Sequence, residues 1–317
     1  WLIPAVAFRI VADDVATVAS WPGSFKLRID AQAPVKYLEF YTGLEARPGM
    51  LVSQFHQSGY RGQSGSRSGG AIRVGISDSA ELNWKHAGLG GYFTSLFPPN
   101  VANSRFGAFW DCQFSTCTSY VPSAVDSHGT AVAGVAFGTI ENGEDINVSD
   151  PTLRIERSGI APLVKPYYYS STNTQNGEYV SSHIAILERA VSDGLDVLNH
   201  SYEWFICNPC AKSCDGGGYL QAEQNSQAAG LLNVHAAGNA GDPGSCSVNP
   251  PASFRQGLAV AALNSTDRLS DYHTMGIWPA SARGGMDMTI NGTTWGQVES
   301  LVDMAAPGCD SRLYAGG

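Results

Sequence analysis

Residues 182–199 read SHIAILERAVSDGLDVLN, a helix pattern that runs directly into a strand pattern. Ser182 can cap the helix, and Gly194 stands just past its expected end. The run 195–199 then has the short apolar character of a buried strand. One face of the helix is apolar, because large aliphatic residues recur there at helical spacing, at Ile184, Leu187 and Val191.

The same alternation extends along the chain on both sides of this stretch. Strands that alternate with helices form a parallel sheet with helices on its faces, so the sequence predicts an α/β fold. Ligands of such sheets bind beyond the carboxyl ends of the strands. The further predicted strands are 71–77, 160–164, 231–236 and 258–262, and the further predicted helices are 130–137 and 219–229.

The amino-terminal part of the chain has a different pattern. Short alternating segments at 6–11, 25–30 and 35–41 are typical of strands, and turn residues separate them. We therefore expect residues 1–58 to form a small β-rich appendage, and residues 59–317 to form the α/β domain. The Gly- and Ser-rich run 58–70 between them predicts a flexible connector or loop.

Composition excludes several classes of partner. The 317 residues carry a formal net charge of −9, which argues against nucleic acid and anionic membranes as partners. The sequence contains no apolar run near the roughly 18 residues that a membrane-spanning helix needs. Hydrophobic residues make up 43% of the chain, enough for a substantial core.

Seven cysteines favour disulfides and a secreted, extracellular protein. We expect Cys112 and Cys117 to pair and to close a small loop. Two more disulfides are expected within the other cluster, with the connectivity open, which leaves Cys309 as the odd cysteine. That cluster lacks the second paired half of a zinc site. Its members are Cys207, Cys210, Cys214 and Cys246.

Three polar residues stand where predicted strands or helices meet the edge of the sheet. Asp78 follows a strand, His128 opens a helix in HGTAVAG, and Asn239 follows a strand in AAGNAG. Acyl transfer needs an imidazole base and a carboxylate that fixes its tautomer. It also needs a donor for the developing oxyanion, which an amide side chain supplies. Taken singly, each residue is more often a turn, cap or structural residue.

Together and in this order, the three segments resemble the blocks of the subtilase family of serine endopeptidases. The resemblance covers roughly residues 59–317, and HGTAVAG at 128–134 is its most specific part. It implies a subtilisin-like parallel sheet, with Asp78 and His128 as catalytic residues and Asn239 as the oxyanion donor. A polypeptide substrate would lie extended along the segments that follow two of the strands. The expected substrate-binding residues are Ser201, Tyr202, Glu203, Ala237 and Gly238.

Two features depart from the family pattern. Glu203 stands at a place often held by Gly, where a carboxylate beside the substrate would favour a basic side chain. The nucleophile block Gly-Thr-Ser does not occur in the sequence. We therefore expect the polypeptide to continue past Gly317 with the serine, and the 317 residues alone to be inactive.

Other functions remain open at this point. The alternative is a catalytically inactive subtilase-like protein that uses its cleft to bind peptides. A metal-dependent hydrolase is disfavoured, because His56, His86, His183 and His273 show no paired ligand spacing. No cofactor is required, although the resemblance is compatible with structural Ca²⁺. The acidic, Asn-containing loop 141–150 is a candidate site for that ion, with a solvated loop as its alternative.

Overall fold

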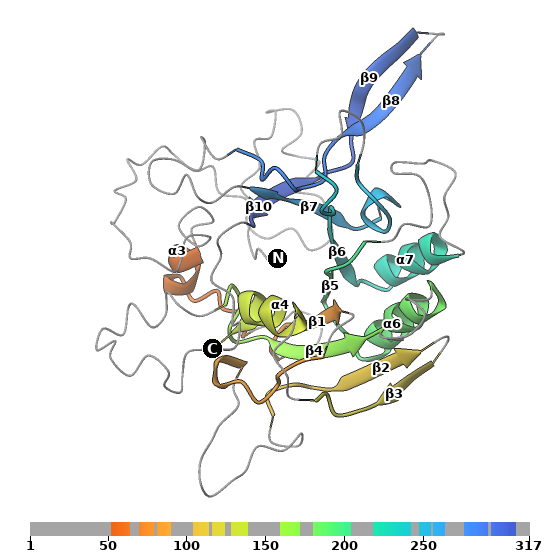
Figure 1. Cartoon of the computed structure of the whole chain (residues 1–317). Coiled ribbons are helices and arrows are strands. Elements are labelled where there is room, and N and C mark those ends of the chain that lie inside the picture. Colours follow the sequence, from red (N-terminus) through yellow and green to blue (C-terminus); the bar gives the residue numbers. More distant parts are fainter. Residues whose placement is uncertain are drawn as a thin grey trace, which may run out of the picture.

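The computed structural model describes residues 52–63, 70–78, 81–89, 104–113, 116–123, 128–138, 159–171, 180–203, 218–241, 247–254, 256–263, 276–290 and 293–308. Within these ranges the chain forms an α/β fold whose centre is a sheet of eight strands (Figure 1). Their order across the sheet is β10-β7-β6-β5-β1-β4-β2-β3. All neighbouring pairs are parallel except β2 and β3.

The strands of this sheet are short and mostly buried. Their bounds are β1 Arg73–Asp78, β2 Phe109–Gln113, β3 Thr116–Ser119, β4 Lys165–Ser170, β5 Val197–His200, β6 Leu232–Ala236, β7 Leu258–Leu263 and β10 Met304–Pro307. A separate antiparallel hairpin lies between β7 and β10 in the chain. It consists of β8 Gly285–Ile290 and β9 Thr293–Ser300.

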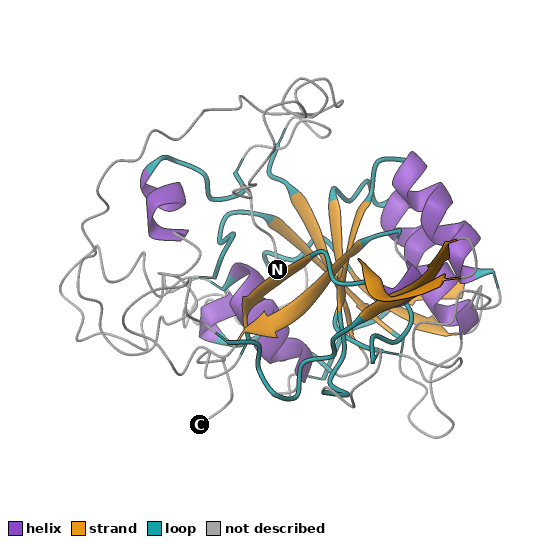
Figure 2. Ribbon diagram, turned by 90° about the horizontal axis from the view of Figure 1, so that it is seen from above, coloured by secondary structure: helices purple, strands orange, loops and turns teal. Residues whose placement is uncertain are grey.

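Helices cover both faces of the sheet. α6, Val180–Ser192, and α7, Tyr219–Ala228, pack together on one face, whereas α4, His128–Phe137, lies on the other (Figure 2). The remaining helical elements are α3 Val52–Gln57, η2 Ala87–Leu89 and η4 Ala252–Phe254.

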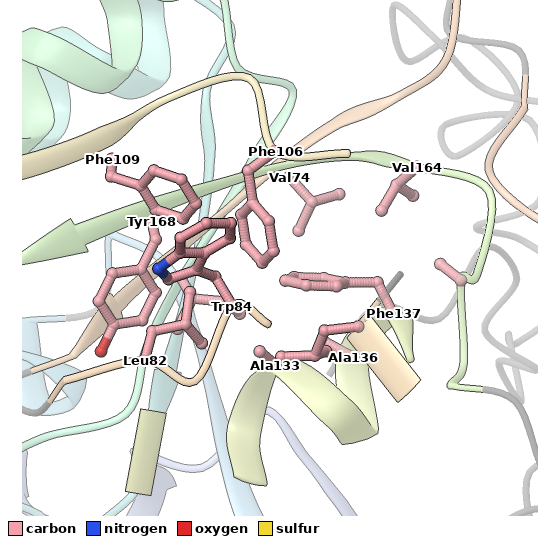
Figure 3. Packing of buried hydrophobic residues seen from close by; sticks show 13 residues of the cluster. Val74, Leu82, Trp84, Phe106, Phe109, Ala133, Ala136, Phe137, Val164 and Tyr168 are labelled. Atoms are coloured by element: carbon pink, nitrogen blue, oxygen red, sulfur yellow. The ribbon is translucent and has the colours of Figure 1, made fainter. Parts of the chain in front are cut away.

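The side chains of each strand alternate between the two faces, as the pleat requires. In β4, Tyr168 joins the core beneath α4, and Tyr169 joins the core beneath α6 and α7. Aromatic rings fill much of the α4 side, where Phe106 packs 4.9 Å from Phe109 and 5.8 Å from Phe137 between ring centroids (Figure 3). Both faces of the central strands are therefore buried, as expected for a parallel sheet.

Most predicted elements are present with shifted ends. The predicted strand 160–164 is wrong, because those residues form a turn in which the Val164 N–H donates to the Ala161 carbonyl. The strand begins one residue later, with β4. Ser182 does not cap α6, which starts at Val180 and buries Ser182 within it. Gly194 does follow the helix, with a left-handed φ of 68°.

The described part of the expected appendage is helical. α3 ends at Gln57, and its buried His56 bonds through Nε2 to the Ile160 carbonyl at 2.8 Å. The following segment also binds the domain, because the Arg61 carbonyl accepts from the Leu163 N–H. The strands predicted within residues 1–51 lie outside the described residues, so the β-rich appendage and its boundary stay predictions.

Candidate functional site

Asp78 is the last residue of β1 and lies at the carboxyl end of the parallel sheet. β1 is flanked by β4 and β5, so the Asp78 carboxylate emerges from the middle of the sheet. Only 1% of this residue is exposed. A carboxylate this deeply buried needs a partner, because burial of an unpaired charge is costly.

His128 is that partner. It is the first residue of α4, and its Nδ1 lies 2.7 Å from Oδ2 of Asp78. The His128 side chain is 61% exposed. Because Nδ1 is engaged by the carboxylate, Nε2 is the nitrogen left to exchange a proton with a substrate or nucleophile. The hydrogen bond to Asp78 raises the pKa of His128, and partial burial opposes that rise.

The start of α4 is held in place on two sides. The Thr130 hydroxyl accepts a hydrogen bond from the Asn83 N–H at 2.8 Å. Gly129 lies against Tyr168, so closely that a Cβ there would be 2.2 Å from the Tyr168 hydroxyl oxygen. The small residue after His128 therefore lets the helix start close to the sheet and bring the imidazole to Asp78.

Asn239 follows β6 in a turn that the neighbouring segments define. The Ala237 N–H donates to the Val260 carbonyl at 2.9 Å, and the Gly238 carbonyl accepts from the Ala282 N–H at 2.8 Å. Gly238 has a φ of 114°, which L residues with a side chain rarely adopt. The turn leaves Asn239 exposed, as an oxyanion donor needs to be.

The segment after β5 lies between the two positions just described. The Ser201 N–H donates to the Ser77 carbonyl of β1 at 3.4 Å, and the Ser201 hydroxyl accepts from the Asn199 amide at 2.7 Å. The Tyr202 ring packs at a tilt against His183, with ring centroids 4.3 Å apart, and its hydroxyl is 2.8 Å from Nδ1 of His200. The Tyr202 side chain therefore packs against and bonds to residues of the protein itself.

Glu203 is partly exposed and forms two hydrogen bonds within the protein. Its Oε1 accepts from the Asn239 N–H at 3.3 Å, and its Oε2 accepts from the Asn249 amide at 3.0 Å. The carboxylate joins the segment after β5 to the turn after β6. Sequence reasoning named Glu203 but missed Asn249, because the two are 46 residues apart and no local pattern connects them.

Strand order explains why these residues gather. β6, β5 and β1 are neighbours in the sheet, and all three are parallel. Their carboxyl ends therefore deliver Asn239, the segment 201–203 and Asp78 to one edge, where α4 adds His128. An imidazole bound to a buried carboxylate, at the same sheet edge as an exposed amide, provides the groups that acyl transfer uses.

A second polar cluster lies beneath this edge, and sequence reasoning missed it. Nε2 of His235 bonds to Oε1 of Glu223, and both side chains are almost completely buried. The His200 ring stacks on His235 at 4.5 Å between centroids, and its Nε2 lies 3.1 Å from Oδ1 of Asn233. Burial, and next the neighbouring His235, lower the pKa of His200 well below its ordinary value.

Cys112 and Cys117 form a disulfide, as predicted, between the paired strands β2 and β3. The other five cysteines lie outside the described residues, and so does the loop 141–150 proposed for Ca²⁺. The described residues contain no group of three or more His, Cys, Asp or Glu side chains suited to a metal ion. Within the same ranges, no helix has both the length and the apolar character needed to cross a membrane.

The fold and the site define a peptidase-like α/β protein, and comparison with known families agrees. The model of the subtilase family matches residues 69–315, and the chain belongs to this family. It is 27% identical over 150 residues to subtilisin DY of Bacillus licheniformis, which covers 46% of the chain and 52% of that protein. It is 29% identical over 191 residues to a thermophilic serine proteinase of Bacillus sp. (strain AK1). That match covers 59% of the chain and 42% of that proteinase.

The chain thus spans about half the length of these curated relatives. Among solved structures it is similar to sphericase, with a TM-score of 0.50 and 20% identity. That match covers 78% of this chain and 67% of the sphericase chain. At this identity the structural match supports the subtilisin-like fold alone.

Proposed function

We propose that this protein is a secreted serine endopeptidase that hydrolyses polypeptides through an Asp–His–Ser triad. Asp78 holds the tautomer of His128, and Nε2 of His128 takes the proton of the serine hydroxyl and passes it to the leaving amine. The Asn239 amide donates to the oxyanion of the tetrahedral intermediate. The observation that carries the proposal is the 2.7 Å contact between His128 and Asp78, at the same sheet edge as the Asn239 turn.

We propose that the nucleophile lies beyond residue 317. The Asp and His blocks, which precede the serine in the motif order of the family, are present, and Gly-Thr-Ser is not in the sequence. The substrate lies along residues 201–203 and 237–238, whose backbone borders the same sheet edge. The Cys112–Cys117 disulfide supports an oxidising, extracellular location.

The test is proteolysis by the full-length protein. A quenched fluorescent peptide library should be cleaved by the wild-type protein and not by His128→Ala, with His86→Ala as the matched control. A fluorophosphonate probe, which reacts with activated serines, should label one serine C-terminal to Gly317. Full hydrolysis by the His128 variant would refute the proposed role of His128. Folded wild-type protein that binds peptides without cleaving them would favour an inactive binding protein.

A further inference from the structure

Glu203 touches the turn that presents the proposed oxyanion donor. Besides the hydrogen bond from the Asn239 N–H, its carboxylate lies against Gly238, where a Cβ would be 2.4 Å from Oε2. The carboxylate therefore occupies the space beside the Gly238 backbone, next to the path proposed for the substrate. This inference rests on the proposed function, because it concerns the substrate of that site.

No described cation balances the charge of this carboxylate. Its two hydrogen-bond partners, the Asn239 N–H and the Asn249 amide, are both neutral. Among the residues that the structure describes, Glu203 forms no ion pair with Lys, Arg or His. Asp78, whose partner His128 must be neutral to act as a base, adds a second negative charge to the same edge.

A fixed anion next to an oxyanion donor opposes the reaction. Negative charge develops on the substrate carbonyl oxygen in the transition state, and like charges at short range repel. A cationic substrate side chain next to Glu203 removes this penalty. It pairs with the carboxylate in the bound state, and it offsets the unfavourable field as the oxyanion forms.

We infer that Glu203 is a specificity-determining residue that selects substrates with Arg or Lys at the residue preceding the scissile bond. The scissile carbonyl, which the Asn239 amide is proposed to bind, belongs to that substrate residue, and the Glu203 carboxylate lies against the same turn at Gly238 and Asn239. The effect of Glu203 on hydrolysis depends on the charge of the substrate. Glu203 favours the hydrolysis of a basic substrate, and it opposes the hydrolysis of a neutral one.

The experiment compares two peptides in the full-length protein. They are identical except that one has Arg, and the other its neutral isostere citrulline, before the scissile bond. The wild-type protein should prefer the Arg peptide in kcat/KM. Glu203→Gln keeps the size of the side chain and the acceptor for the Asn239 N–H. It should lower kcat/KM for the Arg peptide by about tenfold or more and leave that for the citrulline peptide equal or higher.

Two control variants separate charge from position. Asn249→Ala removes one hydrogen bond of Glu203 and keeps its charge, so the preference for Arg should persist. Glu188→Gln, on the exposed surface of α6, removes the same charge elsewhere and should change neither peptide. An equal fall for both peptides in Glu203→Gln would overturn the inference, since the residue then only holds the turn. If the wild-type protein cleaves neither peptide nor any library member, the proposed function fails and the inference fails with it.

Discussion

His128 and Asp78 form a contact of 2.7 Å between an imidazole that is mostly exposed and a carboxylate that is almost completely buried. The buried partner is rigidly placed by β1, so it fixes the orientation of the exposed one. In the full-length protein, Asp78→Asn should lower kcat by about 10⁴, because the amide stabilises the wrong imidazole tautomer. Steady-state kinetics with a peptide substrate measure this. A loss of less than tenfold, in a variant with an unchanged circular dichroism spectrum, would contradict the role given to Asp78.

The pH dependence of activity follows from the same contact. His128 acts as a base only when neutral, so kcat/KM should rise with pH through the pKa of His128. Asp78 raises that pKa above the ordinary value of about 6.5 for histidine. The acid limb of the profile should therefore lie above pH 6.5 in the wild-type protein and move to lower pH in Asp78→Asn. If the acid limb does not move in Asp78→Asn, the ionisation of His128 does not cause it.

The stability linked to this contact has the opposite pH dependence. Because the folded-state pKa of His128 is raised, the pairing of the protonated imidazole with Asp78 stabilises the fold fully below the unfolded-state pKa. That contribution is lost as the pH rises through the folded-state pKa. The exposure of His128 to solvent keeps it small. Urea unfolding of the wild-type protein and of His128→Ala across this pH range tests the sign.

Asn239→Ala should lower kcat by about 10² to 10³, the usual cost of losing one oxyanion donor. KM should change little, since the bond strengthens in the transition state. Asn225→Ala, which alters an exposed residue of α7, is the matched control. If kcat stays the same and only KM rises, Asn239 binds substrate rather than the oxyanion.

Gly129→Ala should destabilise the protein and displace His128. The added Cβ would meet the Tyr168 hydroxyl at 2.2 Å, and overpacking of this kind costs about 1–3 kcal/mol. Tyr168→Phe removes that oxygen, so the double variant should recover part of the lost stability and activity. Thermal unfolding and kcat of the two single variants and the double variant measure the coupling. Strict additivity of the two changes would show that this contact does not limit the approach of α4.

Glu223→Ala should be among the most damaging changes outside the candidate site. It leaves His235 without the partner of its Nε2 in the interior, and the removal of one member of a buried pair costs about 3–5 kcal/mol. Glu223→Gln retains an acceptor and should cost less. Glu188→Ala on the exposed side of α6 should stay within about 0.5 kcal/mol. Equal stability of the three variants in urea would mean that the pair does not stabilise the fold.

Sequence patterns predicted those parts of the fold that local chemistry decides. α7 ends at Ala228, one residue before the predicted end at 229, and Gly230, with a φ of 92°, follows its C-cap Ala229. The strand predicted at 160–164 failed because distant groups determine that segment. Arg105 donates to the Pro162 and Val164 carbonyls, and the Leu163 N–H donates to Arg61. No pattern within residues 160–164 reveals those partners.

The same distinction holds at the candidate site. Asp78, His128 and Asn239 could be named from the sequence because each stands in a compact block, and the structure brings His128 to 2.7 Å from Asp78. Their catalytic roles stay predictions. The orientation of Glu203 was not predictable, because it depends on the Asn239 N–H and on Asn249, which come close only after β5 and β6 pair. The spacing of residues in the sequence does not predict contacts between segments that are distant in the chain.

The β8–β9 hairpin offers an opportunity for protein engineering. Its first residue, Gly285, is paired with its last, Ser300, so the chain leaves the body of the protein and returns at nearly the same point. The hairpin projects away from the eight-stranded sheet (Figure 1). An element attached in this way can be shortened, exchanged or fused to a reporter while the register of β7 with β10 is kept. It provides an attachment point for surface immobilisation or fluorescent labelling that leaves unchanged β1, which carries Asp78, and β6, which precedes Asn239.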